Sequence, residues 1–264
     1  MQERHLNRMQ YFREQANTSR DFYVGYVNRF SHVNPGSRVL EIGCGEGGNL
    51  LPFAESGCKV TGVDIDSHRI QQSQYFFELS GASGDFLCRD FMNFPPPENE
   101  DDRYDIILIH DVIEHIPPSD KFLFLSHLHG FLRCGGVVFF GFPAWQNPFG
   151  GHQQISMGVG SKLPFIHLLP NTLYRFILRL SGSTLSQIGE LERIKCSKVT
   201  IEMFEKLAAS AGFTIVDRTL WLINPHYQQK FNLTARRLWP LFVHLPYLRN
   251  YLTTSAFYIL TSKE

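Results

Sequence analysis

The chain has 264 residues, and its 25 basic and 25 acidic side chains cancel to a formal net charge of zero. This length suits one large α/β domain with insertions, and the balanced charge argues against nucleic acid as a partner. The five cysteines include no C-x-x-C pair, which favours reduced thiols over a zinc site or a disulfide framework. The polar first eight residues lack the apolar core of an export signal, so we expect a cytoplasmic protein.

Predicted strands and helices alternate along the first half of the chain, which is the pattern of a parallel sheet covered by helices. The apolar run at residues 104–110 is typical of a central strand that is buried on both faces. In chain order, we expect strands at residues 38–42, 59–64, 86–89, 104–110 and 137–142, helices at 49–56, 67–80 and 121–132, and a turn at 134–136.

The second half of the chain adds two insertions to this pattern. Residues 144–198 contain an apolar stretch that Pro170, Arg175 and Arg179 interrupt, so it is too charged and broken to span a membrane. A helix at 200–211 and strands at 213–222 and 255–262 then complete the sheet, around a second insertion at 224–254. We therefore predict an α/β fold with a doubly wound, seven-stranded, mostly parallel sheet and a helical cap formed by the insertions. The expected parts are a helical gate at 1–35, a cofactor-binding core at 36–143, a cap or substrate region at 144–198 and the completion of the sheet at 199–264.

A glycine-rich loop follows the first predicted strand. Gly43, Gly45 and Gly47 permit positive φ and lack the side chains that would block a ligand from the main chain. Because ligands of such sheets bind at the carboxyl ends of the strands, the loop predicts a nucleotide-like cofactor. The spacing from Gly43 to Gly48, with Asp64 downstream, also satisfies a dinucleotide fingerprint, so an NAD-dependent oxidoreductase is an alternative. Glu41 opposes it, since a carboxylate beside the loop would repel a pyrophosphate.

Four segments together resemble the class I S-adenosylmethionine-dependent methyltransferases. They read VLEIGCGEG at residues 39–47, GVDID at 62–66, YDII at 104–107 and IEHIP at 113–117. Within that family they are most similar to the ubiquinone-biosynthesis O-methyltransferase group. The resemblance covers roughly residues 36–143 and implies S-adenosylmethionine as cofactor, with S-adenosylhomocysteine as product.

The resemblance also implies roles for single residues. Main-chain groups of the loop would contact the methionine part of the cofactor, Glu41 would orient the loop, and Asp64 would accept the ribose hydroxyls. Arg20 precedes Tyr23 by three residues, as does an arginine in the related group that reaches the cofactor carboxylate. The implied cofactor-binding residues are Arg20, Glu41, Gly43, Cys44, Gly45, Gly47, Asp64, Ile65 and Asp90 with Phe91 at the adenine, and His110 near the sulfonium.

Transfer to a hydroxyl would need a base, for which the candidates are His115, His152 and Asp111. His152 follows two glycines that would let a mobile lid deliver its imidazole. Asp111, Glu114 and His115 are spaced as in a triplet that some quinone O-methyltransferases associate with a divalent ion. We nevertheless expect no metal, because a hard cation usually takes more oxygen ligands.

The identity of the acceptor depends on the insertions. Residues 163–169 and 239–249 are apolar and aromatic with basic edges, so they could cover an apolar acceptor, contact a membrane surface or pack together as a cap. We predict methyl transfer to a small-molecule or lipid-linked acceptor, at oxygen. A non-catalytic regulatory protein that binds the cofactor on the same fold is the remaining alternative.

Overall fold

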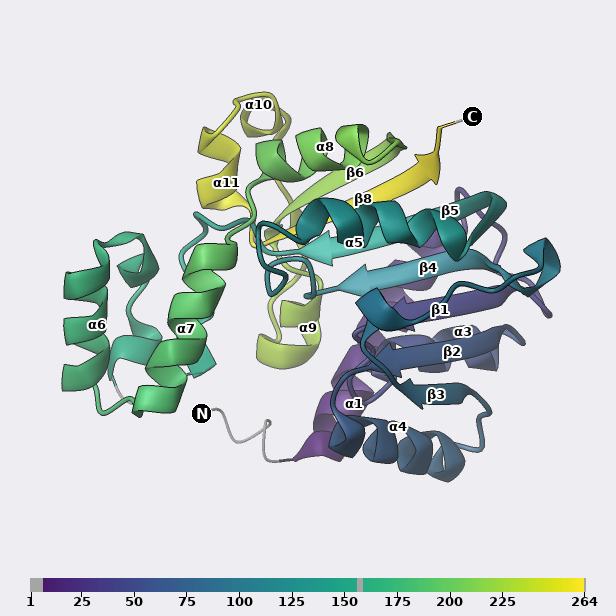
Figure 1. Cartoon of the computed structure of the whole chain (residues 1–264). Coiled ribbons are helices and arrows are strands. Elements are labelled where there is room, and N and C mark those ends of the chain that lie inside the picture. Colours follow the sequence, from purple (N-terminus) through teal and green to yellow (C-terminus); the bar gives the residue numbers. More distant parts are fainter. Residues whose placement is uncertain (1–6, 156–158, 264) are drawn as a thin grey trace.

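The computed structural model describes residues 7–155 and 159–263. Residues 1–6 of the predicted gate, residues 156–158 of the predicted cap and residue 264 lie outside the described residues. Figure 1 shows a twisted sheet with helices on both faces and two further helices beyond one edge of it. The strand arrowheads of β4 and β5 point toward those two helices, so they stand at the carboxyl ends of the parallel strands.

The strands form one sheet in the order β3-β2-β1-β4-β5-β8-β6-β7. The first five pair in parallel, while β8 runs antiparallel to both of its neighbours. The predicted doubly wound, mostly parallel sheet is confirmed, but the count of seven strands was wrong by one. The strands are β1 (Arg38–Ile42), β2 (Lys59–Asp64), β3 (Asp85–Cys88), β4 (Tyr104–His110), β5 (Leu132–Phe142), β6 (Phe213–Ile223), β7 (Arg236–Arg237) and β8 (Ser255–Ser262).

The additional strand, β7, is a two-residue piece of the second insertion that pairs with the edge strand β6. Two residues are too few to show the alternation that identifies a strand in a sequence. The predicted turn at 134–136 lies within β5, which begins at Leu132: Leu132 pairs with Tyr104, and after a register shift around Gly135, whose φ is 74°, regular pairing resumes at Val137. The preceding helix accordingly ends at His127 rather than at 132.

Side chains of the central strands alternate between two apolar layers, as the twofold period of a strand requires. Ile107 and Ile109 of β4 lie in one core, beneath α5 and α8, and Ile106 and Leu108 lie in the other. The second core includes side chains of the N-terminal helices and of α3 and α4. The covering helices are α1 (Arg8–Thr18), which continues through a π-helical turn (Ser19–Tyr23) into α2 (Val24–Val27), then α3 (Leu51–Glu55), α4 (Ser67–Leu79), α5 (Lys121–His127) and α8 (Ile201–Ser210).

The inserted residues between β5 and α8 form a helical pair with a small core of its own. Tyr174 and Leu178 of α6 (Asn171–Leu180) pack with Ile188 and Leu191 of α7 (Leu185–Ser197). The second insertion contributes α9 (His226–Phe231), α10 (Pro240–Val243) and α11 (Leu248–Leu252). Within the described ranges, no helix combines the length and the apolar character needed to cross a membrane.

We expect Gly62→Ala to destabilise the fold, because a Cβ at this buried position of β2 would lie 2.7 Å from Phe86 and 2.8 Å from the Cys44 sulfur. Overpacking of this kind costs about 1–3 kcal/mol of unfolding free energy. Gly189→Ala in α7 is the matched control, since nothing lies within 4 Å of its added Cβ. Urea unfolding should show a loss for Gly62→Ala and no loss for Gly189→Ala, and equal stability of the two variants would contradict the packing described here.

Candidate active site

The glycine loop turns back over the end of β2 and is held there by hydrogen bonds. The amides of Gly43 and Cys44 donate to the Val63 carbonyl at 2.8 and 3.1 Å. The amide of Gly45 donates to Oδ2 of Asp64 at 2.9 Å. The φ angles of Gly43 and Gly45 are 70° and 52°, in the left-handed region that favours glycine. The loop and the Asp64 carboxylate are therefore one rigid unit at the carboxyl edge of the sheet.

The members of the loop face different surroundings. A Cβ on Gly43 would lie 2.5 Å from Val112, whereas one on Gly47 would lie 2.8 Å from Phe86 of β3. Gly47 therefore packs against the sheet, and its predicted part in a ligand contact has no support in its position. The Cys44 side chain is also buried, so only its main chain can face a ligand.

A cavity of about 360 Å³ opens beside the loop at the carboxyl ends of β1 and β4. Its wall combines residues from the N-terminal helix, the glycine loop, the loop after β4, the loop after β5 and α7 of the cap. Residues of the predicted gate, core and cap therefore all line the cavity, whereas residues of the C-terminal part at 199–264 do not. The lining residues are Arg8, Tyr11, Gln15, Gly43, Gly45, Glu46, Asn49, Arg69, His110, Asp111, His115, His152 and Glu190.

The residues predicted to hold the adenosine lie along the same edge but outside the cavity wall. Asp64 ends β2, and Ile65 after it is 74% exposed, so its side chain is free to cover a ring. Asp90 follows β3 and caps a short 3₁₀ turn through Met92. The Phe91 side chain is buried, which leaves its main chain for a ligand.

Arg20 does not reach this edge. Its guanidinium donates to Glu55 at 2.7 Å, and Arg20 is not among the residues that line the cavity, so its position gives no support to the predicted role as a cofactor ligand. Tyr23, three residues later, is buried against the sheet. Arg8 and Tyr11 of α1 have the same three-residue spacing as Arg20 and Tyr23, and both of them line the cavity. The spacing was informative, but its first occurrence, not its second, faces the site.

Glu41 lies beneath the loop and acts on the cavity through a neighbour. It is 1% exposed, and its Oε1 accepts a 2.7 Å hydrogen bond from the Asn49 side chain, which lines the cavity. Burial raises the pKa of Glu41 to about 8, although the hydrogen bond from Asn49 opposes this shift. Sequence reasoning missed Asn49 because it was assigned only as the start of a helix.

His110 is held between two partners at the floor of the cavity. Tyr23 Oη lies 2.8 Å from its Nε2, and Asp111 Oδ2 lies 3.3 Å from its Nδ1. Burial raises the pKa of Tyr23 well above its usual value, so the phenol keeps its proton and donates it to Nε2. Nδ1 then carries the imidazole proton toward Asp111. Both nitrogens of His110 therefore have a partner.

Asp111 remains an anion beside this pair. Desolvation in the cavity would raise the pKa of its carboxyl, but the neighbouring His110 and His152 outweigh that effect and lower the pKa below its usual range. Its φ of 54° is uncommon for a residue other than glycine, and His152 has the same φ. Two residues in left-handed conformations thus form part of the cavity wall, where backbone strain is often found.

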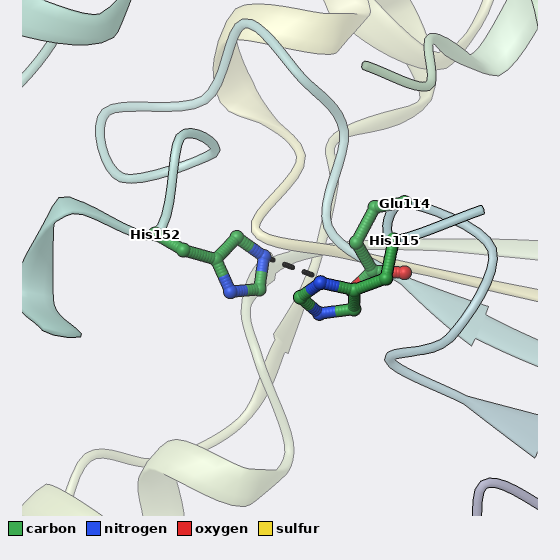
Figure 2. Close-up of side chains that lie close together, drawn as sticks. All are labelled: Glu114, His115 and His152. Atoms are coloured by element: carbon green, nitrogen blue, oxygen red, sulfur yellow. Dashed lines mark ion pairs between the residues drawn. The ribbon is translucent and has the colours of Figure 1, made fainter. Parts of the chain in front are cut away.

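Glu114, His115 and His152 meet at the other side of the cavity, from two different loops (Figure 2). His152 Nε2 lies 3.7 Å from Glu114 Oε1, and the two imidazole rings are 5.3 Å apart between centroids. Burial raises the pKa of Glu114 well above its usual value and lowers the pKa of His152 to about 4. Burial also lowers the pKa of His115. Burial therefore favours the neutral form of all three side chains.

Both loops are fixed by contacts outside the cavity. The buried Lys121 ammonium donates to the carbonyls of Ile113 and Ile116 at 2.5 and 2.7 Å and so holds the segment that carries Glu114. On the other loop, a Cβ at Gly151 would lie 2.2 Å from His167, and one at Gly150 would lie 2.3 Å from the Trp145 carbonyl. The glycines before His152 are therefore explained by close packing, and the prediction that they supply a mobile lid has no support here.

The same three side chains could hold a cation. Their ligand atoms lie within 4.8 Å of one another, and among the described residues neither Glu114 oxygen has a hydrogen-bond partner. The metal alternative raised from the sequence joined Asp111 to Glu114 and His115, but the structure brings His152 to that pair instead. His152 is distant in sequence, so the spacing of the triplet could not reveal it.

This fold, with a glycine loop and a polar cavity at the carboxyl edge, defines a nucleotide-type ligand site in a doubly wound sheet. The chain belongs to the methyltransferase-domain family, whose sequence pattern it matches from residue 12 to residue 218. The resemblance seen in the glycine loop and in the strand ends is thereby confirmed. The family match selects the methyltransferase over the dehydrogenase alternative.

Individual relatives agree with the family match. A ubiquinone biosynthesis O-methyltransferase from Bradyrhizobium sp. (strain ORS 278) is 34% identical over 103 residues, which are 39% of this chain and 38% of that protein. One from Nitrobacter winogradskyi is 32% identical over 131 residues, 50% of this chain and 46% of that protein. The chain therefore matches less than half the length of these curated relatives.

A solved structure extends the similarity to nearly the whole chain. Magnesium protoporphyrin IX methyltransferase from Synechocystis PCC 6803 with bound SAH superposes with a TM-score of 0.56 at 16% identity, over 95% of this chain and 84% of that one. At this identity the comparison supports the fold and leaves the reaction to the residues of the site.

We expect Glu41 to make the stability of the unliganded protein depend on pH. A folded-state pKa of about 8 lies above the ordinary 4.5, so the stability from this proton is complete below about pH 4.5 and is lost as pH rises through 8. Glu41→Gln keeps an acceptor for Asn49 but cannot titrate. Between pH 5 and 8, urea unfolding should show the native protein losing roughly 3 kcal/mol more than this variant. Glu78→Gln on the exposed face of α4 is the control, and identical pH profiles for native protein and Glu41→Gln would refute the assignment.

Proposed function

We propose that the protein is an S-adenosylmethionine-dependent methyltransferase that methylates a hydroxyl oxygen of a small-molecule acceptor. The observation that carries this proposal is the composition of one cavity. One side of it is the glycine loop with Asn49 and Arg8, and the other side presents the neutral imidazoles of His115 and His152. Such a cavity offers a place for the methionine part of the cofactor directly opposite groups that can accept a proton.

The edge of the sheet supports the cofactor assignment. Gly43 and Gly45 line the cavity, and the Asp64 carboxylate is held at the end of β2, where it can accept the ribose hydroxyls. Ile65 and the segment Asp90–Phe91 lie farther along the same edge, where the adenine would bind. Arg8 and Asn49 would hold the carboxylate and amino groups of the methionine part.

The charges in the cavity also suit a cationic ligand. Asp111 stays ionised, and the buried Glu41 beneath the loop holds its proton near neutral pH. A bound ammonium would lower the pKa of Glu41 through its charge, which would release that proton on binding. The two carboxyl groups would thus provide negative charge on the methionine side of the site.

When bound, S-adenosylmethionine supplies an electrophilic methyl group. The cavity residues would position the acceptor for the displacement, and positioning of this kind accounts for much of the rate of such a reaction. His152 would accept the proton that the acceptor hydroxyl loses when it is methylated. His115 lies beside it and is the second candidate base. His110 and Asp111 pair with each other and would lie on the cofactor side.

The acceptor is proposed to be a phenol or related small molecule that could be attached to a lipid. The relatives named for ubiquinone biosynthesis suggest oxygen methylation, and the cavity volume of about 360 Å³ suits a small acceptor group. The exposed Glu190 of α7 lies on the cap side of the cavity and can accept a hydrogen bond from a second polar group of the acceptor.

We expect Arg8→Met to weaken binding of S-adenosylmethionine by about tenfold or more, because a charge-assisted hydrogen bond to the cofactor carboxylate is lost. Arg20→Met is the matched control, since Arg20 pairs with Glu55 away from the cavity. Isothermal titration calorimetry measures both. If only Arg20→Met lost affinity, Arg20 and not Arg8 would bind the cofactor carboxylate.

We expect His152→Ala to lower kcat by about 10²–10⁴ while it changes the cofactor Kd little, because proton transfer contributes to the rate and not to cofactor binding. His32→Ala, at an exposed position before β1, is the control. The measurement is transfer of labelled methyl to the best acceptor from a panel of phenols, catechols, amines and thiols. If chelation abolishes transfer in the native protein and added Mg²⁺ or Mn²⁺ restores it, the three side chains hold a cation instead of moving the proton alone.

The same panel tests the proposed function itself. Transfer to a phenol or catechol is the expected result, and transfer only to an amine or thiol would overturn the assignment to oxygen. Tight binding of S-adenosylmethionine without transfer to any acceptor class would instead support the non-catalytic alternative.

A further inference from the structure

The segment that joins β7 to β8 buries two polar side chains and exposes several large apolar ones. Arg249 and Asn250 are buried at 7% and 0% exposure, whereas the large apolar side chains around them face outward. Lone exposed apolar residues are common on proteins, but a contiguous group marks a surface that meets something other than water. Residues 238–252 are called the α10–α11 segment below. Its exposed apolar residues are Trp239, Leu241, Leu245, Tyr247, Leu248 and Tyr251.

Buried hydrogen bonds hold the segment in this orientation. Arg249 donates to Glu202 at 2.9 Å and to Glu205 at 3.1 Å, both on α8. Asn250 donates to Glu202 at 2.7 Å and accepts from the Ile201 amide at 2.8 Å. The side chains that water would normally solvate thus anchor the segment to α8, and the apolar ones cannot turn inward without breaking this network.

Backbone conformation reinforces the outward display. Tyr247 has a φ of 64°, an unfavourable value for an aromatic residue, and its amide donates to Glu202 at 2.9 Å. Its side chain is 68% exposed. The strained residue therefore presents its ring to the outside while its main chain is tied to the same carboxylate that holds Arg249. Figure 1 shows α10 and α11 together at one end of α8, at the periphery of the molecule.

The charge around the segment is entirely basic in sequence. No acidic residue lies between Asp217 and Glu264, and Arg236 and Arg237 are exposed immediately before the segment. Glu202 and Glu205 of α8, the acids that contact it, are engaged by Arg249. The Arg237 guanidinium lies over the Trp221 ring of β6, 5.8 Å from its centroid, and the exposed Trp239 follows two residues later in the chain.

We propose that the α10–α11 segment docks the protein onto the surface of an anionic lipid bilayer. Tryptophan and tyrosine place an apolar ring and a polar group across the boundary of a membrane, and basic side chains beside them attract anionic headgroups. The exposed Arg236 and Arg237 next to the segment, with no acidic residue between positions 217 and 264, match a surface of anionic headgroups. The segment and the cavity are separate, so the proposal does not depend on the methyl acceptor.

Vesicle sedimentation of the full chain tests the proposal with phosphatidylcholine vesicles, with and without phosphatidylglycerol. Binding is expected to the anionic vesicles and to weaken with added salt. The triple variant Trp239→Ser, Leu241→Ser, Tyr247→Ser should bind at least about tenfold more weakly. Tyr75→Ser with Leu79→Ser on α4 is the control, since both side chains are 59% exposed elsewhere on the molecule. Circular dichroism and thermal melting check that each variant is folded.

Fluorescence adds a readout at the segment itself. Of the three tryptophans, Trp239 is 59% exposed while Trp145 and Trp221 are each 8% exposed, so a blue shift on adding vesicles reports on Trp239. Trp239→Phe should abolish the shift yet retain most of the binding. Absence of binding to either vesicle type, equal binding of the triple variant, or a lipid-free dimer that the triple variant disrupts would each overturn the proposal. None of these readouts requires cofactor or methyl transfer.

Discussion

The hydrogen bonds that fold the glycine loop back over the end of β2 are the constraint on which the site depends. The amides of Gly43 and Cys44 donate to the Val63 carbonyl, and the amide of Gly45 donates to Asp64. The loop and the Asp64 carboxylate therefore cannot move separately. This rigid edge places the main chain beside the cavity at the point where strand order reverses, between β1 and β4. The remaining walls of the site are assembled around it from segments that are far apart in the chain.

Burial decides which groups around this edge carry charge. It disfavours the ionised form of Glu41 and of Glu114 and the protonated form of His152, and their pKa values move in the directions that this predicts. Asp111 is the exception, because the imidazoles beside it stabilise its anion. The cavity therefore sets the Asp111 carboxylate beside imidazoles that can take a proton, within a wall that also carries Arg8, Glu46, Arg69 and Glu190. Shifted pKa values of this kind are common at functional sites.

The sequence predicted most of the sheet, because buried parallel strands are apolar runs and their helices alternate with them. Prediction from the sequence failed where an element is too short to show a pattern, or where the same pattern occurs more than once. The two-residue β7 is too short to show a period. The arginine–tyrosine spacing occurs twice, and the spacing alone could not tell that Arg8, rather than Arg20, lines the cavity. The glycines before His152 looked like a hinge, but the carbonyl of Trp145 and the side chain of His167 occupy the space that side chains there would need.

The sequence by itself determined the fold class, the position of the ligand edge and the kind of cofactor, because these depend on contiguous residues such as the glycine loop and the acidic strand ends. Only the tertiary structure decided that His152 from the loop after β5 meets Glu114 and His115, and that Tyr23 and Asp111 occupy both nitrogens of His110. It also decided that the α10–α11 segment turns Arg249 inward and its apolar residues outward. The physical reason is the same in each case. The burial and the partners of a side chain depend on segments that are distant in sequence, so they cannot be inferred from the spacing of nearby residues.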